Sequence, residues 1–346
     1  MADFLGHGIF SSDGDQWLWQ RKASSYEFNK RSLRNFVVST VRFEAVERLL
    51  PLLSRAELDG LTLDMQDVLE RFAFDNICCI AFDEDPACLT EVGLGANGRA
   101  EFMHALNDAQ IIVMARFMSP VKWAWRIKKL INIEPERRMS EAVATIHGYV
   151  NRIIRERSER GEAGLARKDD FLSRFISSGE HSDESLRDVV TNFILAGRDT
   201  TSSALTWFFW LLSNQHEVED KIVHEVCTVR ASSRSTDAAF SFDELREMHY
   251  LHAAITESMH GVPTGALTGR GGCVPARELV QVPHFPRWAK DVPRQGDGLH
   301  TNEVHRRVLE RFSFQFVGGE GRPGLVFSVT LGMEGGLPMQ VKKRGH

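Results

Sequence analysis

The sequence has few of the features that mark secreted, zinc-binding or nucleic-acid-binding proteins. Its 346 residues include only five cysteines, an odd number too small for a disulfide framework, which favours a reducing compartment. Neither a Cys-x-x-Cys pair nor a His-Glu-x-x-His motif is present, so a structural zinc site is not expected. The 47 acidic residues outnumber the 42 basic ones, and the resulting net charge of −5 indicates no nucleic-acid partner.

No segment has the composition of a signal peptide or of a clean membrane span. The first residues, 1–8, contain neither an apolar core nor a basic flank. The most apolar stretch runs over 193–212, and it carries Arg198 and Asp199, whose burial in lipid would be costly. We therefore expect the chain as given to be cytoplasmic or peripheral to a membrane.

Helical periodicity dominates the rest of the chain and predicts a mainly α fold with a small C-terminal β-hairpin region. Apolar residues recur at the spacing of one helix face, with polar residues between them. Helices are expected from about Asp64 onward, over 136–157, over 183–212 and over 242–259. Short strands are expected at 313–317, 325–331 and 339–342, with Gly-Gly and Pro turns between them.

The composition changes abruptly after Met259. Residues 260–307 are rich in glycine, proline and histidine and show neither a helical nor a strand period. We therefore divide the chain into a helical part, 1–259, an altered and disordered segment, 260–307, and a C-terminal part, 308–346, that holds a helix end and β-hairpins.

The centre of the helix expected at 183–212 reads Ala-Gly-Arg-Asp-Thr-Thr over 196–201. Glycine, acid and hydroxyl residues are poor choices for a helix interior, because they compete for backbone hydrogen bonds or add chain entropy. One interpretation is a widened helical turn that a ligand can approach. The alternative is a threonine hydroxyl bonded to the carbonyl oxygen four residues back, with Asp199 in solvent. The motif alone does not decide between them.

A second candidate motif lies near the start of the chain. Trp17-Leu-Trp-Gln-Arg21 places an indole and a guanidinium four residues apart, and therefore on one face of a helix. Arginine is the side chain best suited to grip a carboxylate through two parallel hydrogen bonds. An ordinary amphipathic helix with a surface arginine is the alternative.

Taken together, these two motifs resemble those of cytochromes P-450. The Ala-Gly-x-Asp-Thr-Thr string resembles the family's oxygen-activation helix, and Trp-x-x-x-Arg resembles the helix that binds a haem propionate. The resemblance implies that Asp199 and Thr200 deliver protons during oxygen activation and that Gly197 leaves room for dioxygen. It also implies that Trp17 and Arg21 bind a propionate of haem b.

Longer strings narrow the resemblance to plant fatty-acid ω-hydroxylases, over 1–259 and 308–344. It implies a P-450-like helical fold that hydroxylates a long-chain fatty acid or another apolar small molecule. It also implies electrons from NADPH through a partner NADPH-cytochrome reductase, and an endoplasmic-reticulum membrane location for intact relatives. Such relatives begin with a membrane anchor and a β-region, which this chain is expected to lack. The strings that carry the resemblance are 13–28, 31–36, 74–82, 193–204 and 321–338.

Two features depart from the family's pattern. The family's Glu-x-x-Arg ion pair is replaced by Glu257-Ser-Met-His260, and histidine cannot form the same forked pair, so Glu257 keeps only a structural role. The family's haem loop, Phe-x-x-Gly-x-Arg-x-Cys-x-Gly, supplies the iron's thiolate ligand and has no counterpart here. We therefore assign no metal ligand; the weak alternatives are Cys273, His284, His300 and His305.

A shifted reading frame or a mis-spliced gene would explain the missing loop. Read one base out of frame, residues 285–295 permit all five fixed positions of the loop at the correct spacing, and 297–305 permit the helix that follows it. Two functions therefore stay open for this chain. One is a haem-dependent fatty-acid monooxygenase; the other is a catalytically dead helical remnant that binds apolar ligands at most.

Overall fold

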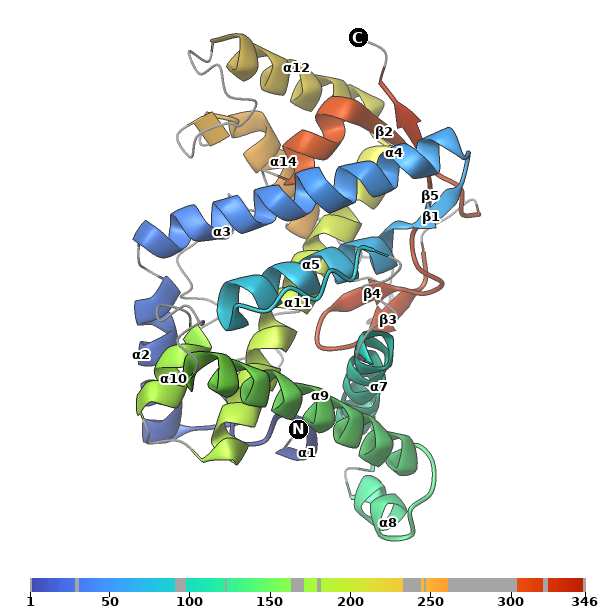
Figure 1. Ribbon diagram of the computed structural model, residues 1–346. Coiled ribbons are helices and arrows are strands. Elements are labelled where there is room, and N and C mark those ends of the chain that lie inside the picture. The colour runs from blue at the N-terminus through green and yellow to red at the C-terminus, as the bar shows by residue number, and fades with distance from the viewer. Residues whose placement is uncertain are drawn as a thin grey trace. The chain divides into compact units, whose positions relative to one another are not determined.

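The structure is a computed structural model and is mainly α, as the sequence predicts (Figure 1). The contacts between residues divide the chain into two compact units, each made of several separate stretches of the sequence. Two helices contribute to both units: α5 (Met65–Phe82) and α11 (Asp183–Ser213). The structure describes residues 2–28, 31–90, 98–121, 123–162, 171–178, 182–232, 244–245, 247–260, 304–319 and 323–344.

Unit 1 comprises Met1–Lys30, Arg71–Thr200 and Leu325–Glu334. Besides its shares of α5 and α11, it holds six helices and one hairpin among the described residues. These are α1 (Ala2–Leu5), α2 (Gly14–Phe28), α7 (Arg99–Met118), α8 (Ala124–Leu130), α9 (Glu136–Glu162), α10 (Phe171–Ser178), β3 (Leu325–Phe327) and β4 (Leu331–Met333).

The core of unit 1 forms where the apolar stripes of α5, α7, α9 and α11 meet. The stripe expected on α9 is buried there, as Met139, Ile146, Val150 and Ile153 are all almost inaccessible to solvent. Tyr149 stacks on Phe102 of α7 with ring centroids 4.3 Å apart. Aromatic pairs of this kind add to the stability that burial alone supplies.

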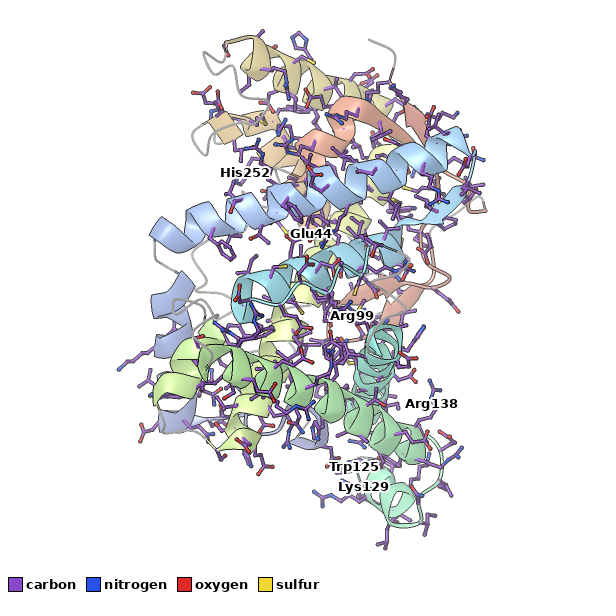
Figure 2. The ribbon with its side chains drawn as sticks, in the orientation of Figure 1. Glu44, Arg99, Trp125, Lys129, Arg138 and His252 are labelled. Atoms are coloured by element: carbon purple, nitrogen blue, oxygen red, sulfur yellow. The ribbon has the colours of Figure 1, made fainter. Side chains whose placement is uncertain are left out.

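A buried ion-pair cluster joins α7 to the start of α9. The Arg116 guanidinium donates to both carboxylate oxygens of Glu136 and, at 3.1 Å, to Asp3 of α1. It also lies 4.7 Å from the ring centroid of Trp125, while Lys129 donates to Asp3 at 2.6 Å. Figure 2 shows Trp125 and Lys129 on α8. The cluster thus ties α1 and α8 to the α7–α9 pair.

Unit 2 comprises Arg31–Glu70, Thr201–Gly324 and Gly335–His346. It contains the second part of α11, the start of α5 and a helix over 304–311. Its other described elements are α3 (Arg31–Glu44), the π-helix η1 (Ala45–Leu49), α4 (Leu50–Leu58), β1 (Thr62–Asp64), α12 (His216–Ser232), α14 (His249–His260), β2 (Phe312–Phe316) and β5 (Pro338–Lys343).

A small antiparallel sheet in the order β1-β5-β2 anchors unit 2, with Thr62 opposite Gln340 and Phe314 opposite Val341. Asp64 links this sheet to α5. Its Oδ1 accepts the backbone N–H of Gln66 at 3.0 Å, which caps the helix, and that of Leu337 at 2.8 Å. A Cβ on Gly336 would lie 2.1 Å from Oδ2 of Asp64, so glycine is required there.

The structure agrees with most predicted elements and corrects one. The long helix expected over 183–212 is α11, and its start is capped by Ser182, whose Oγ accepts the Ser185 N–H at 3.2 Å. The single strand expected at 325–331 is wrong, because the chain turns back there to form the β3–β4 hairpin. Ser328 makes the turn, since its hydroxyl donates to the Thr330 carbonyl oxygen at 2.8 Å.

Two helix boundaries differ from the expectation. Among the described residues, α14 begins at His249, seven residues after the expected start at Phe242. Glu225 of α12 sets this start by accepting the N–H groups of Tyr250 and Leu251 at 2.7 and 2.8 Å. Residues 304–307, assigned above to the altered segment, form the first turn of the 304–311 helix. His260, also assigned to that segment, is the last residue of α14, and the remainder, 261–303, lies outside the described residues.

Candidate functional site

The predicted propionate pair lies on α2 in unit 1. Trp17 and Arg21 are both partly buried, and the Arg21 guanidinium carbon stands 5.4 Å from the centroid of the Trp17 ring. This stacking places the two side chains on one face of α2, as the i, i+4 spacing predicts. An indole N–H beside a guanidinium fork suits a carboxylate. The geometry therefore fits the edge of a porphyrin that carries propionates.

At the Asp-Thr motif the structure agrees with only one part of the alternative interpretation, because α11 is α-helical throughout and has no widened turn. Thr200 is exposed, and its hydroxyl donates to the Ala196 carbonyl oxygen at 2.7 Å, so the intrahelical bond is present. Asp199, in contrast, is 5% exposed and therefore not in solvent. Its Oδ1 accepts a hydrogen bond from Nη1 of Arg198 at 2.7 Å.

Arg198 is the residue at this motif to which the sequence assigned no role. It is 1% exposed and ranks among the largest fully buried side chains of the described residues. A buried charge requires a partner of opposite sign, and Asp199 is such a partner. The sequence signal for this pair is the presence of two adjacent opposite charges inside an otherwise apolar run.

Gly197 is enclosed by a neighbouring helix. A Cβ at this position would lie 2.5 Å from Cδ1 of Ile77 and 2.9 Å from its Cβ, both on α5 in unit 1. Real Cβ atoms do not approach other atoms so closely, so only glycine allows α5 and α11 to come this near. In the structure the side of α11 beside Gly197 is thus occupied by Ile77.

Glu257 of the altered Glu-x-x-Arg motif lies on α14 in unit 2. Its side chain is exposed, and no described residue forms an ion pair with it. The side chain of His260 lies outside the described part of the structure. Among the described residues, no interaction takes the place of the family's ion pair at Glu257.

No described cysteine lies in a string that resembles the family's haem loop, so none is assigned as an axial iron ligand. Cys78 and Cys88 are fully buried in unit 1, and burial raises the pKa of both thiols well above the usual value, so they stay protonated. Cys79 of α5 is partly buried, and Cys227 lies exposed on α12. Cys273, His284 and His300 lie outside the described residues. The described side chains therefore fit the edge of a porphyrin but include no counterpart of the loop that supplies the iron's thiolate.

His305, the remaining alternative ligand, is buried inside unit 2. Its ring lies 3.9 Å from that of Phe208, centroid to centroid, and 5.4 Å from that of Phe209. Neither ring nitrogen has a hydrogen-bond partner among the described residues. Burial lowers the pKa of His305 to about 3. The imidazole is therefore neutral and enclosed by aromatic rings.

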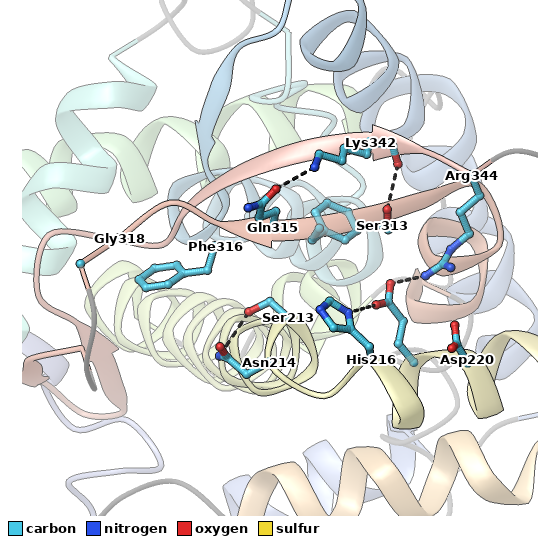
Figure 3. Close-up of a pocket in the computed structure, with 13 residues that line it drawn as sticks. Ser213, Asn214, His216, Asp220, Ser313, Gln315, Phe316, Gly318, Lys342 and Arg344 are labelled. Atoms are coloured by element: carbon cyan, nitrogen blue, oxygen red, sulfur yellow. Dashed lines mark hydrogen bonds and ion pairs between the residues drawn. The ribbon is translucent and has the colours of Figure 1, made fainter.

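A separate pocket of about 790 Å³ opens on unit 2, beside the end of α11 and the start of α12 (Figure 3). Its floor is ionic, because Glu219 pairs with Arg344 and lies 3.6 Å from Nδ1 of His216. None of the predicted site residues lines it. Its described lining is Ser213, Asn214, His216, Glu219, Asp220, Ser313, Phe314, Gln315, Phe316, Gly318, Gly319, Lys342 and Arg344.

Comparison with known proteins agrees with the motifs. The sequence model described as Cytochrome P450 matches residues 1–270. Cytochrome P450 CYP94D108 of Paris polyphylla is 43% identical over 271 residues, which cover 78% of this chain and 53% of that protein. Cytochrome P450 94A1 of Vicia sativa is 44% identical over 264 residues, 76% of this chain and 49% of that protein.

A third relative reaches further along the chain. Cytochrome P450 94B1 of Arabidopsis thaliana is 42% identical over 309 residues, 84% of this chain and 58% of that protein. This chain therefore spans about half the length of these relatives. Among solved structures, the cytochrome P450DA heme domain superposes with a TM-score of 0.69 at 18% identity, covering 99% of this chain and 81% of that one.

At that identity the structural likeness shows the fold alone, and it confirms the expected P-450-like helical architecture. The family match over 1–270 includes α2 with Trp17 and Arg21, and α11 with Asp199 and Thr200. Together with relatives above 40% identity, this match decides the family. The chain belongs to the cytochrome P450 family.

Proposed function

We propose that this chain is built for haem-dependent hydroxylation of a long-chain fatty acid, and that the polypeptide as it stands has lost that activity. One observation supports the proposed hydroxylase design. Unit 1 contains both the Trp17–Arg21 face on α2 and the Asp199–Thr200 pair on α11. The loss rests on the sequence, which has no counterpart of the family's haem loop and its thiolate ligand.

In this proposal each site residue has one task. Trp17 and Arg21 hold a propionate of haem b through an indole N–H and a guanidinium fork. Asp199 and Thr200 serve as the proton-handling groups, and Gly197 allows the close approach of α5 to α11. A bound haem would supply the oxygen activation typical of P450 monooxygenases only with a thiolate on its iron. The sequence has no counterpart of the loop that supplies that ligand in the family.

The fatty-acid substrate and the electron source rest on the resemblance to plant ω-hydroxylases. Hydroxylation converts a C–H bond, dioxygen, two electrons and two protons into an alcohol and water. The electrons would come from NADPH through a separate NADPH-cytochrome reductase. Intact relatives would work at the endoplasmic-reticulum membrane. Among the residues that the structure describes, no helix is both long enough and apolar enough to cross a bilayer.

The second candidate function is an inert helical remnant that at most binds apolar ligands. The observation that favours it is the burial of polar side chains in the helix at 304–311. His305 and Arg306 are fully buried there, in a core where natural proteins place apolar residues. Such burial accords with the hypothesis that residues up to 307 are read out of frame and that the family's frame resumes at Val308.

Two measurements test this proposal. The purified chain is incubated with haemin, a reductase, NADPH and a C12–C18 fatty-acid mixture, and products are analysed by mass spectrometry; we expect no hydroxylated acid. Transcript sequencing across codons 255–310 should then reveal a shifted frame or a splice error. An unshifted transcript together with an abundant, active protein would refute the proposed loss of activity.

A further inference from the structure

We propose that Asp188 and Asn192 of α11 are positioning residues for the porphyrin site. They form hydrogen bonds with the segment Gly6–Phe10, and this segment in turn forms hydrogen bonds with α2, the helix that carries Trp17 and Arg21. The inference rests on the proposed function, because it concerns how the two halves of that site are held relative to each other. All the residues involved lie in unit 1.

The first half of this network joins α11 to the segment. Oδ2 of Asp188 accepts the His7 N–H at 2.8 Å, and Oδ1 of Asn192 accepts the Phe10 N–H at 3.2 Å. The Asn192 amide also donates to the Leu5 carbonyl oxygen at 2.9 Å. Asp188 and Asn192 are 5% and 1% exposed, so these hydrogen bonds are shielded from competing water.

Two glycines make this close approach possible. A Cβ on Gly6 would lie 2.0 Å from Oδ2 of Asp188, and one on Gly8 would lie 2.0 Å from Nδ2 of Asn192. Gly6 also has a φ of +53°, a conformation that L side chains rarely adopt. The two glycines of the Gly6-His-Gly8 string therefore leave the space that the side chains of Asp188 and Asn192 occupy.

The second half of the network joins the same segment to α2. Gln20, which is 6% exposed, donates from Nε2 to the His7 carbonyl oxygen at 2.9 Å. Gln16, one turn earlier, donates to the same oxygen at 3.3 Å. His7 thus gives its N–H to α11 and its carbonyl oxygen to α2. Gln20 directly precedes Arg21, and consecutive side chains of an α-helix point about 100° apart, so the bridge holds α2 on the flank next to the predicted propionate face.

Because α11 is a continuous helix, fixing Asp188 and Asn192 also fixes the position of Asp199 and Thr200, the predicted proton-handling pair. Asn192 and Asp199 are seven residues apart, about two turns, so they lie on nearly the same side of α11 and about 10 Å apart along its axis. Asp188 lies one further turn back on that side. The hydrogen bonds to His7 and Phe10 therefore fix α2 relative to the stretch of α11 that ends in Asp199 and Thr200.

The test measures how tightly the chain binds metal-free protoporphyrin IX, which carries both propionates but needs no iron ligand. Binding is followed by quenching of tryptophan fluorescence in the full chain. Asn192→Leu and Asp188→Ala should each raise the Kd about tenfold, as Arg21→Ala should, because each removes buried hydrogen bonds on which the site depends. Asp188→Asn retains an oxygen acceptor and should stay within about threefold of the unaltered chain.

The matched control is Asn76→Leu. Asn76 is also a buried asparagine of unit 1, and its amide donates to the Phe72 carbonyl oxygen at 2.7 Å within α5. This variant should lose stability and leave the Kd unchanged. An unchanged Kd in Asn192→Leu, or an equal rise in Asn76→Leu, would overturn the positioning role.

A second measurement separates this inference from the proposed function. If the unaltered chain binds no protoporphyrin IX, the propionate site itself fails, and hydrogen exchange then decides the inference. Asn192→Leu should speed amide exchange over residues 7–22 well beyond its effect on α9, and Asn76→Leu should not. Equal exchange over 7–22 in the unaltered chain and in Asn192→Leu would rule out a link from α11 to α2.

Discussion

Ile77 of α5 fills the space that a side chain on Gly197 would need, with its Cδ1 2.5 Å from the ideal Cβ position. Gly197→Ala should therefore destabilise unit 1 by about 1–3 kcal/mol, because overpacking outweighs the gain of about 1 kcal/mol in helix propensity. In the background Ile77→Ala, the same substitution should cost less. Urea unfolding of the two single variants and the double variant measures this coupling.

Gly148→Ala is the matched control for that experiment. Gly148 lies inside α9 of the same unit, and a Cβ there would have nothing within 4 Å. The substitution should stabilise the chain by up to about 1 kcal/mol through helix propensity. Equal effects of the two Gly→Ala substitutions would contradict the close approach of α5 and α11.

The Arg116–Glu136 pair offers a test of the packing around α8. Glu136 is 2% exposed, so Glu136→Ala leaves a largely buried guanidinium with Asp3 as its remaining carboxylate among the described contacts. We expect a loss of about 3–5 kcal/mol in unfolding free energy. Glu134→Ala, which removes the exposed pair with Arg137, should cost less than about 1 kcal/mol. Similar losses in both variants would show that the cluster is not buried.

His305 should make the stability of unit 2 depend on pH. Burial lowers its pKa from 6.5 to about 3 in the folded chain, so below pH 6.5 the unfolded chain binds a proton that the folded chain does not. Stability is therefore lost as the pH falls from about 6.5 towards 3, by about 1.4 kcal/mol per pH unit from this group. Above pH 6.5 the group contributes no slope.

The substitution His305→Leu isolates this effect. It removes the titrating ring but keeps an apolar side chain against Phe208, so its unfolding free energy should fall less between pH 7 and pH 5 than that of the unaltered chain. From the slope above, the two should diverge by about 2 kcal/mol over that interval. Parallel pH profiles for the two proteins would show that His305 is solvated.

Local patterns accounted for the features that the sequence predicted well. The apolar run with a polar start located α11 to within one residue, and the spacing of Trp17 and Arg21 placed them on one face because i, i+4 geometry is local. Features that depend on distant contacts were missed. The hydrogen bond from the Phe10 N–H to Asn192 joins residues 182 positions apart. The need for glycine at positions 6 and 8 follows only from such distant contacts, so the sequence alone did not indicate it.

The same distinction explains two of the segments that the sequence misjudged. Nothing in Leu325–Leu331 signals a break except Ser328, whose hydroxyl closes the hairpin turn. The helix at 304–311 begins four residues before its family-like pattern. Val308, Leu309 and Phe312 are buried and hold the end of this helix in place. Because each residue added to an existing helix gains one backbone hydrogen bond, the helix extends into residues 304–307. Periodicity cannot detect such an extension, since His305 and Arg306 are not core-type residues.

The carbon-monoxide difference spectrum of the reduced, haemin-treated chain tests the central claim most directly. We predict that the long-wavelength Soret band typical of a thiolate-bound carbonyl complex is absent, because the sequence has no counterpart of the loop that supplies the family's thiolate ligand. The same treatment of a full-length relative serves as the positive control. A thiolate-type band from this polypeptide would contradict the account.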